Sequence, residues 1–158
     1  VYYNLGNIYQ KRGMYDQAIK AYRTSLSYRD DIDVDTLVNI GGALTILGKR
    51  DAARTAYERA RKKAPRDPRV PHGLAILLHL DGEYQAALDT YGQLHSMAPD
   101  YARAYYDKAR PLLELDRTRD AIGALEQYLE LAPDGDYAQK ARERIKTYEE
   151  QLENRDPQ

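Results

Sequence analysis

The sequence predicts an all-α protein, an α-solenoid built from repeated pairs of helices. Three observations lead to this fold class. A set of small and apolar residues recurs with a period of 34 residues, except that the first step is one residue longer. Within each period the apolar residues are three or four positions apart, which is the spacing of one helix face. A glycine or an aspartate interrupts each period near its middle. A fixed period in this range is typical of solenoids, whose units pack only on their neighbours.

Four segments of the chain align on one another. The aligned positions are Leu5, Gly6, Tyr9, Gly13, Ala18 and Tyr22; Ile40, Gly41, Leu44, Gly48, Ala53, Tyr57 and Pro65; Leu74, Ala75, Leu78, Gly82, Ala87, Tyr91 and Pro99; and Lys108, Ala109, Leu112, Asp116, Ala121, Leu125 and Pro133. We therefore place four helix–turn–helix units within residues 1–134, at about 1–32, 34–67, 68–101 and 102–135.

The helices follow from the turn and stop signals of each unit. Glycine suits the left-handed backbone that ends a helix, and aspartate substitutes for it at some cost. Proline cannot continue a helix, so it ends the second helix of a pair. The predicted helices are 1–12, 15–28, 35–47, 50–64, 69–81, 84–97, 102–115 and 118–131.

A ninth helix is predicted at about 137–153, within a capping segment 136–153. Its narrow apolar stripe comprises Ala138, Ala141, Ile145, Tyr148 and Leu152, and its other face is charged. Such a helix covers the last repeat with one face and meets water with the other. We expect residues 154–158 to fray. No matching cap precedes Val1, so we expect further repeats or another domain upstream.

Packing explains the small residues of the pattern. Gly6, Gly41, Ala75 and Ala109 are expected where paired helices approach closely, and a bulky side chain there costs on the order of 1–3 kcal/mol. Phe and Trp are absent, whereas Tyr occurs 15 times. Tyr must therefore fill the aromatic core positions, and each buried hydroxyl needs a hydrogen-bond partner.

Composition narrows the function classes. The net charge of −1 argues against a nucleic-acid binder, and no apolar run is long enough to span a membrane. The absence of Cys excludes disulfides, a thiol nucleophile and thiolate zinc sites. It leaves the compartment open; we favour the cytoplasm, with the periplasm as the alternative.

The stretch "YYNLGNIYQKRGMYDQAIKAYRTSL" resembles the tetratricopeptide repeat (TPR). Tyr2, Leu5, Gly6, Tyr9, Ala18 and Tyr22 match its pattern, with Tyr2 in place of Trp and Tyr22 in place of Phe. The likeness covers residues 1–134 and is weakest in the fourth unit. It implies a right-handed superhelix whose concave groove, lined by the first helix of each pair, binds an extended peptide or a partner helix. It also implies a non-catalytic interaction scaffold with no cofactor.

Carried over by spacing, the resemblance places a set of side chains in this groove. They are Tyr3, Asn4, Asn7, Lys11, Asn39, Arg69, His72, His79, Arg103, Tyr106 and Arg110, with Gln10, Asp35 and Asp107 nearby. Arg and Tyr are common energetic anchors, so Arg69, Tyr106 and Arg110 lead the predicted contacts. The mixed charges favour an acidic ligand only weakly.

One TPR subgroup clamps a C-terminal carboxylate with Lys, Asn, Asn, Lys and Arg. Asn7, Asn39 and Arg69 fall at three of these places. Tyr3 and Gly73 fall at the other two and supply no charge, so the resemblance disfavours such a clamp.

Other candidate chemistry is weaker. A calcium loop at Asp30, Asp31, Asp33 and Asp35 lacks the required Gly and Glu, and Asp33 or Asp35 more plausibly caps the next helix. His72 and His79 are two helical turns apart, about 10 Å, too far to share a metal. No nucleophile–base pair is evident, so no enzyme is predicted.

Two features keep alternatives open. The basic segment 49–69 fits a solvated outer face, or a docking site for an acidic partner or phosphate backbone. Pro111 should kink its helix, which either is tolerated or widens the groove locally.

Two other functions also stay open. The first is self-assembly through an exposed edge at Tyr2, Leu5 and Tyr9. In the second, the chain is the interaction module of a larger protein.

Overall fold

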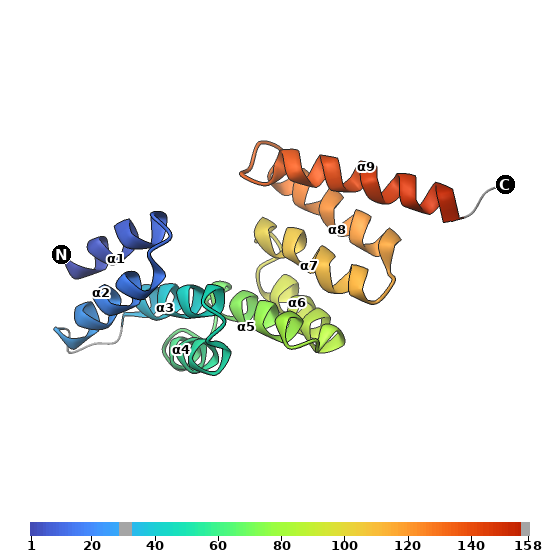
Figure 1. Ribbon diagram of the computed structural model, residues 1–158. Coiled ribbons are helices and arrows are strands. Elements are labelled where there is room, and N and C mark those ends of the chain that lie inside the picture. Colours follow the sequence, from blue (N-terminus) through green and yellow to red (C-terminus); the bar gives the residue numbers. More distant parts are fainter. Residues whose placement is uncertain (29–32, 156–158) are drawn as a thin grey trace. The chain divides into compact units, whose positions relative to one another are not determined.

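The computed structural model describes residues 1–28 and 33–155, and its regular structure in those ranges is entirely α-helical (Figure 1). The helices are α1 (Tyr2–Lys11), α2 (Tyr15–Ser27), α3 (Val34–Ile46), α4 (Arg50–Lys63), α5 (Arg69–Leu80), α6 (Tyr84–Met97), α7 (Ala102–Glu114), α8 (Thr118–Leu131) and α9 (Ala138–Arg155). Each of them coincides with a predicted helix to within two residues at either end.

The chain divides into two compact units, Val1–Leu77 and Leu78–Gln158, with the boundary inside α5. In the first unit α1 packs on α2, α2 on α3 and α3 on α4. In the second unit α6 packs on α7, α7 on α8 and α8 on α9. Each unit therefore contains antiparallel helix pairs whose neighbours in sequence are neighbours in space.

The turns inside the helix pairs share one geometry. Gly13, Gly48, Gly82 and Asp116 have φ values of 72°, 70°, 81° and 55°. In each turn the amide of the next residue donates a 2.9 Å hydrogen bond back to the last turn of the preceding helix, as Lys49 N does to Leu44 O. This bond satisfies a carbonyl group that the helix leaves unpaired. The predicted left-handed turns, including the one that uses aspartate, are confirmed.

Tyrosine rings fill the space beside the small residues of the first unit. Tyr22 is fully buried and packs against Gly6, where an added Cβ would lie 2.4 Å from the ring. Tyr57 fills the space beside two glycines in the same way: an added Cβ would lie 2.7 Å from its ring at Gly41 and 2.2 Å from it at Gly73. The close approach predicted at Gly6 and Gly41 is confirmed, and its cause is the tyrosine of the paired helix.

The second unit has a core of its own, which α9 completes. Ala138 and Ala141 of α9 are buried, and the half-buried Ile145 and Tyr148 pack beside them. The predicted capping stripe therefore faces the preceding helices. The helix continues to Arg155, so the prediction that the chain frays from residue 154 is wrong for 154 and 155. Residues 156–158 lie outside the described ranges.

Pro111 lies inside α7 and its ring is buried. The α-helix runs through it from Ala102 to Glu114 without a break in its assignment. The ring contributes apolar surface to the core of the second unit, which offsets the loss of one backbone donor.

Candidate functional site

Three of the predicted groove residues meet on the face formed by α1 and α3. The side-chain amide of Asn39, on α3, donates hydrogen bonds to Asn7 Oδ1 at 3.3 Å and to the Tyr3 hydroxyl at 3.4 Å, both on α1. All three side chains are half-buried. We name Tyr3, Asn7 and Asn39 the amide cluster.

Tyr22 supports the amide cluster from the core. Its hydroxyl donates to Asn7 Oδ1 at 2.7 Å and lies 2.9 Å from Gln10 Oε1. Burial raises the pKa of Tyr22 to about 12, and the nearby Tyr3 adds to the rise. The phenol is therefore protonated at neutral pH and remains a donor. Because Asn7 Oδ1 accepts two hydrogen bonds, from Tyr22 and Asn39, the orientation of the Asn7 amide is fixed.

The amide cluster keeps polar atoms available for a ligand. Asn7 Nδ2 and Asn39 Oδ1 make no hydrogen bond to another described residue. Neither atom is among the buried polar atoms that lack a hydrogen-bond partner, which in the described side chains are His79 Nδ1 and His95 Nε2. The two amide atoms are therefore reachable from solvent. Together they offer a donor and an acceptor, which is what an extended peptide backbone requires.

Arg69, at the start of α5, is already held by two carboxylates. Its guanidinium donates to both oxygens of Asp67, at 2.9 and 2.5 Å, and to Asp35 Oδ1 at 2.6 Å. The hydrogen bonds from Arg69 lower the pKa of Asp67. Two negative charges surround one positive charge, so this location does not attract an anion. The weak expectation of an acidic ligand for the groove as a whole therefore gains no support from Arg69.

A carboxylate clamp is also incompatible with the packing of α5. Gly73 stands where that clamp requires a charged side chain. A Cβ on Gly73 would lie 2.2 Å from Tyr57 Cζ, and 2.5 Å from Cε1 of the same ring. The buried ring occupies the space that a lysine side chain needs, so the first unit lacks the clamp for a physical reason.

In the second unit, Arg103 and Tyr106 contact the segment that leads into α9. The Arg103 guanidinium lies 3.7 Å above the Tyr137 ring and donates to Asp107 Oδ2 at 2.6 Å. Burial alone would lower the pKa of Arg103, but the Asp107 carboxylate outweighs it and raises that pKa. Arg103 is thus a partner of the protein's own capping segment.

Tyr106 is a core residue. Only 2% of its surface is exposed, and its ring packs 4.7 Å from Tyr137 and 5.4 Å from Tyr128. Arg144 of α9 lies 5.0 Å from the same ring. The prediction that Tyr106 projects toward a ligand is therefore corrected: the aromatic ring holds α7, α8 and α9 together.

The remaining predicted residues differ in their exposure to solvent. Asn4 and Lys11 on α1 and Arg110 on α7 are exposed, and His72 on α5 is half-buried. His79 packs beside Tyr84 with ring centroids 5.5 Å apart. Burial, opposed by Glu114, lowers the pKa of His79, so this side chain is neutral at pH 7.

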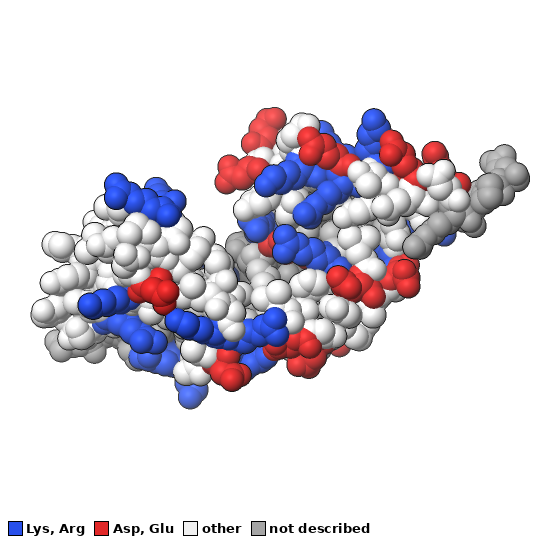
Figure 2. Space-filling model, viewed as in Figure 1, with Lys and Arg blue, Asp and Glu red and all other residues white. Residues whose placement is uncertain are grey.

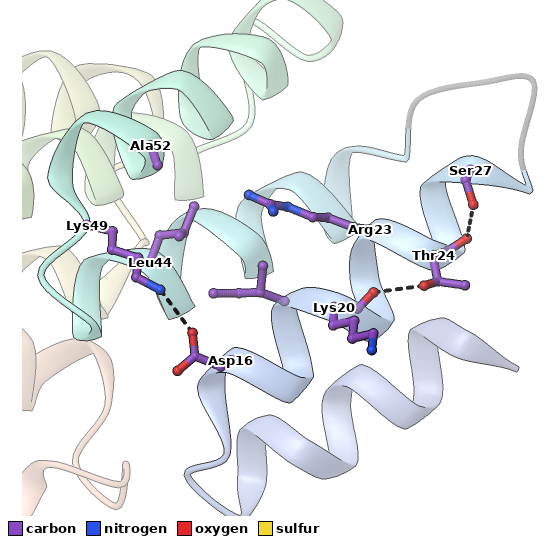
Figure 3. Close-up of a pocket in the computed structure, with 9 residues that line it drawn as sticks. Asp16, Lys20, Arg23, Thr24, Ser27, Leu44, Lys49 and Ala52 are labelled. Carbon is purple, nitrogen blue, oxygen red and sulfur yellow. Dashed lines mark hydrogen bonds and ion pairs between the residues drawn. The ribbon is translucent and has the colours of Figure 1, made fainter.

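A pocket of about 480 Å³ that the sequence did not predict lies between α2 and the α3–α4 turn (Figure 3). The ion pair between Lys49 Nζ and Asp16 Oδ1, 2.9 Å long, closes one end, and Thr24 and Ser27 lie at the other. Arg23 extends from α2 across the space. The pocket draws on three helices, so no single helical stripe in the sequence reveals it.

The basic segment 49–69 does not form one continuous cationic surface. Arg61 pairs with Glu58 at 2.6 Å, and Lys49 and Arg69 are paired as described above. On the face shown in Figure 2, basic and acidic side chains are interspersed. This pattern fits the solvated outer face that was one of the two interpretations of the segment.

A metal site and a membrane-spanning helix each place requirements on the described ranges. No group of three His, Cys, Asp or Glu side chains there could hold a metal ion. Of the proposed calcium ligands, Asp30 and Asp31 lie outside the described residues. Asp33, one of the two predicted caps, occupies the N-cap position of α3, but its side chain makes no capping hydrogen bond to the helix backbone. It accepts a hydrogen bond from the Thr36 hydroxyl instead. No described helix combines the length and apolarity that crossing a membrane requires.

Paired helices, left-handed turns and tyrosines packed on glycines define a helical-repeat protein. Three models of the tetratricopeptide repeat match the chain, over residues 1–31, 43–102 and 78–145. The chain belongs to the tetratricopeptide repeat family, with the family's all-α solenoid fold. Membership of this family supports a role as a protein-interaction scaffold.

The chain is also similar to individual known proteins. Protein O-mannosyl-transferase Tmtc3 of Drosophila melanogaster is 26% identical over 133 residues, which are 75% of this chain and 14% of that protein. TTC0263, a thermophilic TPR protein in Thermus thermophilus, has a TM-score of 0.81 at 18% identity and covers 96% of this chain and 81% of its own. YrrB, a TPR protein with an unusual peptide-binding site, has a TM-score of 0.66 at 22% identity, with 90% and 73% covered.

Proposed function

We propose that the chain binds an extended peptide on the α1–α3 face, with the amide cluster as its central contact. The observation that carries this proposal is the double hydrogen bond to Asn7 Oδ1, from Tyr22 at 2.7 Å and from Asn39 at 3.3 Å. It fixes two side-chain amides in advance, so little conformational entropy is lost when a peptide binds.

The chemistry of the amide cluster favours recognition of the peptide backbone over recognition of charge. Asn7 Nδ2 can donate to a peptide carbonyl, and Asn39 Oδ1 can accept from a peptide amide. The charge of Arg69 is compensated by Asp35 and Asp67. A neutral or mixed-charge peptide therefore suits this face. The description of the structural relative YrrB as a peptide-binding TPR protein is consistent with this role.

Affinity measurements on the full chain test the proposal. A peptide ligand is first selected from a random-sequence display library, and its affinity is then measured by titration calorimetry. We expect the double variant Asn7→Ala/Asn39→Ala to bind at least ten-fold more weakly. Gln17→Ala, on the exposed surface of α2, is the matched amide control and should bind within two-fold of the original chain. Equal affinity of the double variant and the control would refute the proposal.

Self-association through α1 is a second candidate, because apolar residues are exposed at that edge. Tyr2 is 41% exposed and Ile8 47% exposed. Tyr2 also stacks on the exposed Tyr28, with ring centroids 5.6 Å apart. Light scattering across a concentration series distinguishes this candidate: a mass that rises with concentration, and that Ile8→Glu reduces to the monomer value, supports it. A constant monomer mass excludes it.

A further inference from the structure

Lys108 departs from the repeat pattern at a packing position. The other three units place Leu5, Ile40 and Leu74 there. Ile40 and Leu74 are only 5% and 9% exposed, so this position normally contributes to the core. In the fourth unit a cationic side chain occupies it, and neither helix pairing nor the amide cluster explains that substitution.

A cavity of about 390 Å³ opens beside Lys108, between α7 and α8. Leu112 and Ala124 line it with apolar surface, and Tyr105 lines it with an aromatic ring. Tyr105 is fixed in place, because it stacks on His95 at 3.7 Å between ring centroids with the planes 4° apart. The wall of the cavity is therefore partly apolar and partly polar.

The charges around the cavity do not balance. Lys108, Arg117 and Arg119 line it together with one carboxylate, that of Asp120. Arg117 binds that carboxylate with an Nη2–Oδ2 distance of 2.6 Å. Lys108 makes no hydrogen bond or ion pair with any other described residue. The half-buried ammonium group thus has no direct ion-pair partner within the described chain, and the Asp120 carboxylate acts on it only from beyond ion-pair distance.

The electrostatics of Lys108 agree with this geometry. Burial lowers its pKa, and the positive charge of Arg117 adds to the lowering, whereas Asp120 opposes it. A half-buried charge without a partner is destabilising, and an anion bound beside it removes part of that penalty.

We propose that this cavity binds the carboxylate of an acidic side chain on a protein partner, with Lys108 Nζ as the ion-pair donor and the walls of Leu112 and Ala124 packing on the partner's apolar groups. Arg117 is paired with Asp120, and Arg119 also interacts with another group, so Lys108 is the cation left for a ligand. Its single charge matches a carboxylate better than the double charge of a phosphate monoester. The cavity lies between α7 and α8, so the site is separate from the amide cluster and does not depend on it.

Chemical-shift mapping on the full ¹⁵N-labelled chain tests the proposal with defined probes. The probe is the tripeptide acetyl-Leu-Glu-Leu-amide, and its neutral isostere acetyl-Leu-Gln-Leu-amide is the control. Inorganic phosphate at equal ionic strength is a third arm. We expect the glutamate peptide to shift the amides of Tyr105, Lys108 and Gly123 saturably, and the glutamine peptide to bind at least five-fold more weakly.

Two substitutions separate Lys108 from general charge effects. Lys108→Leu restores the residue type of the other repeats and should reduce the affinity for the glutamate peptide at least five-fold. Lys62→Leu, on the exposed side of α4, removes the same charge and should change it less than two-fold. Lys108→Gln checks the result without an apolar replacement, and circular dichroism confirms that each variant is folded. The proposal is overturned if both peptides bind equally, if phosphate alone binds, or if Lys108→Leu retains the affinity.

Discussion

The ring of Tyr22 occupies the space into which a side chain at Gly6 would project. An added Cβ at Gly6 would lie 2.4 Å from both Cδ1 and Cε1 of that ring. Tyr22 is fully buried and cannot retreat toward solvent. The contact joins α1 to α2, and through the Tyr22 hydroxyl it also positions the amide cluster.

Gly6→Ala should therefore destabilise the protein. Overpacking costs about 1–3 kcal/mol, and the helix propensity of Ala returns about 0.5–1 kcal/mol of it, so we expect a net loss of about 1 kcal/mol, within a range of about 0–2.5 kcal/mol. Gly92→Ala is the matched control, because Gly92 lies inside α6 with no neighbouring heavy atom within 4 Å of an added Cβ. Urea unfolding should show this control to be equal to or more stable than the original chain. A destabilised Gly92→Ala combined with an unchanged Gly6→Ala would contradict the packing account.

The stability of the fold should fall at alkaline pH. Tyr22 has a pKa of about 12 in the folded chain, above the ordinary value of 10. The unfolded chain therefore loses this proton first, and the stability that the buried phenol contributes is present below pH 10 and is lost as the pH rises toward 12. Tyr22→Phe removes this ionisation, at a cost of about 0.5–1.5 kcal/mol at neutral pH for the lost hydroxyl bonds. Urea unfolding at several pH values should show a shallower alkaline decline for this variant than for the original chain.

Acidic pH should weaken the fold through His95. Burial lowers the pKa of His95 to about 4, and the charge of Lys108 contributes to the lowering. The unfolded chain binds this proton more readily, so stability is lost as the pH falls from about 6.5 toward 4. His95→Gln should flatten this decline.

Lys108→Leu tests independently whether the charge of Lys108 lowers the pKa of His95. Removing the neighbouring positive charge should raise the pKa of His95, measured by NMR titration of the imidazole protons. A His95 that titrates near 6.5 in the original chain would contradict both the burial and the coupling.

Tyr106→Ala should be among the most destabilising substitutions in the second unit. The ring joins α7, α8 and α9, and truncating a buried aromatic side chain costs about 3–5 kcal/mol. Tyr106→Phe keeps the ring and removes a hydroxyl that makes no hydrogen bond to another described residue, so its cost should be much smaller. Thermal unfolding of the two variants checks this difference. If Tyr106→Ala unfolds like the original chain, the ring is not the core residue that we describe.

The sequence predicted the helices well, because a local signal in the sequence marks the end of each helix. Gly13, Gly48 and Gly82 require the left-handed backbone, and Asp116 adopts it at the equivalent place. The partner of each small residue was harder to predict, because it lies on another helix. The Tyr22 ring beside Gly6 emerges only when the two helices are packed together.

The candidate site was predicted only in part, because repeat spacing places residues on a helix face but does not give their contacts with other segments. Repeat spacing placed Tyr3, Asn7 and Asn39 on one face, and they do meet. Spacing could not show that Tyr137, outside the repeats, lies over Tyr106. It also could not show that Asp67, just before α5, folds back to bind Arg69. Contacts with connecting segments follow no helical period, so a pattern of helical positions does not reveal them.

The most direct test of peptide binding by the amide cluster is an NMR map of a selected peptide on the ¹⁵N-labelled full chain. We predict that the largest chemical-shift changes fall on α1 and α3, that the side-chain amides of Asn7 and Asn39 are among them, and that Tyr22→Phe weakens binding because the Asn7 amide loses its fixed orientation. Changes confined to other helices, undisturbed Asn7 and Asn39 amides, or a library that yields no peptide ligand would contradict the proposal.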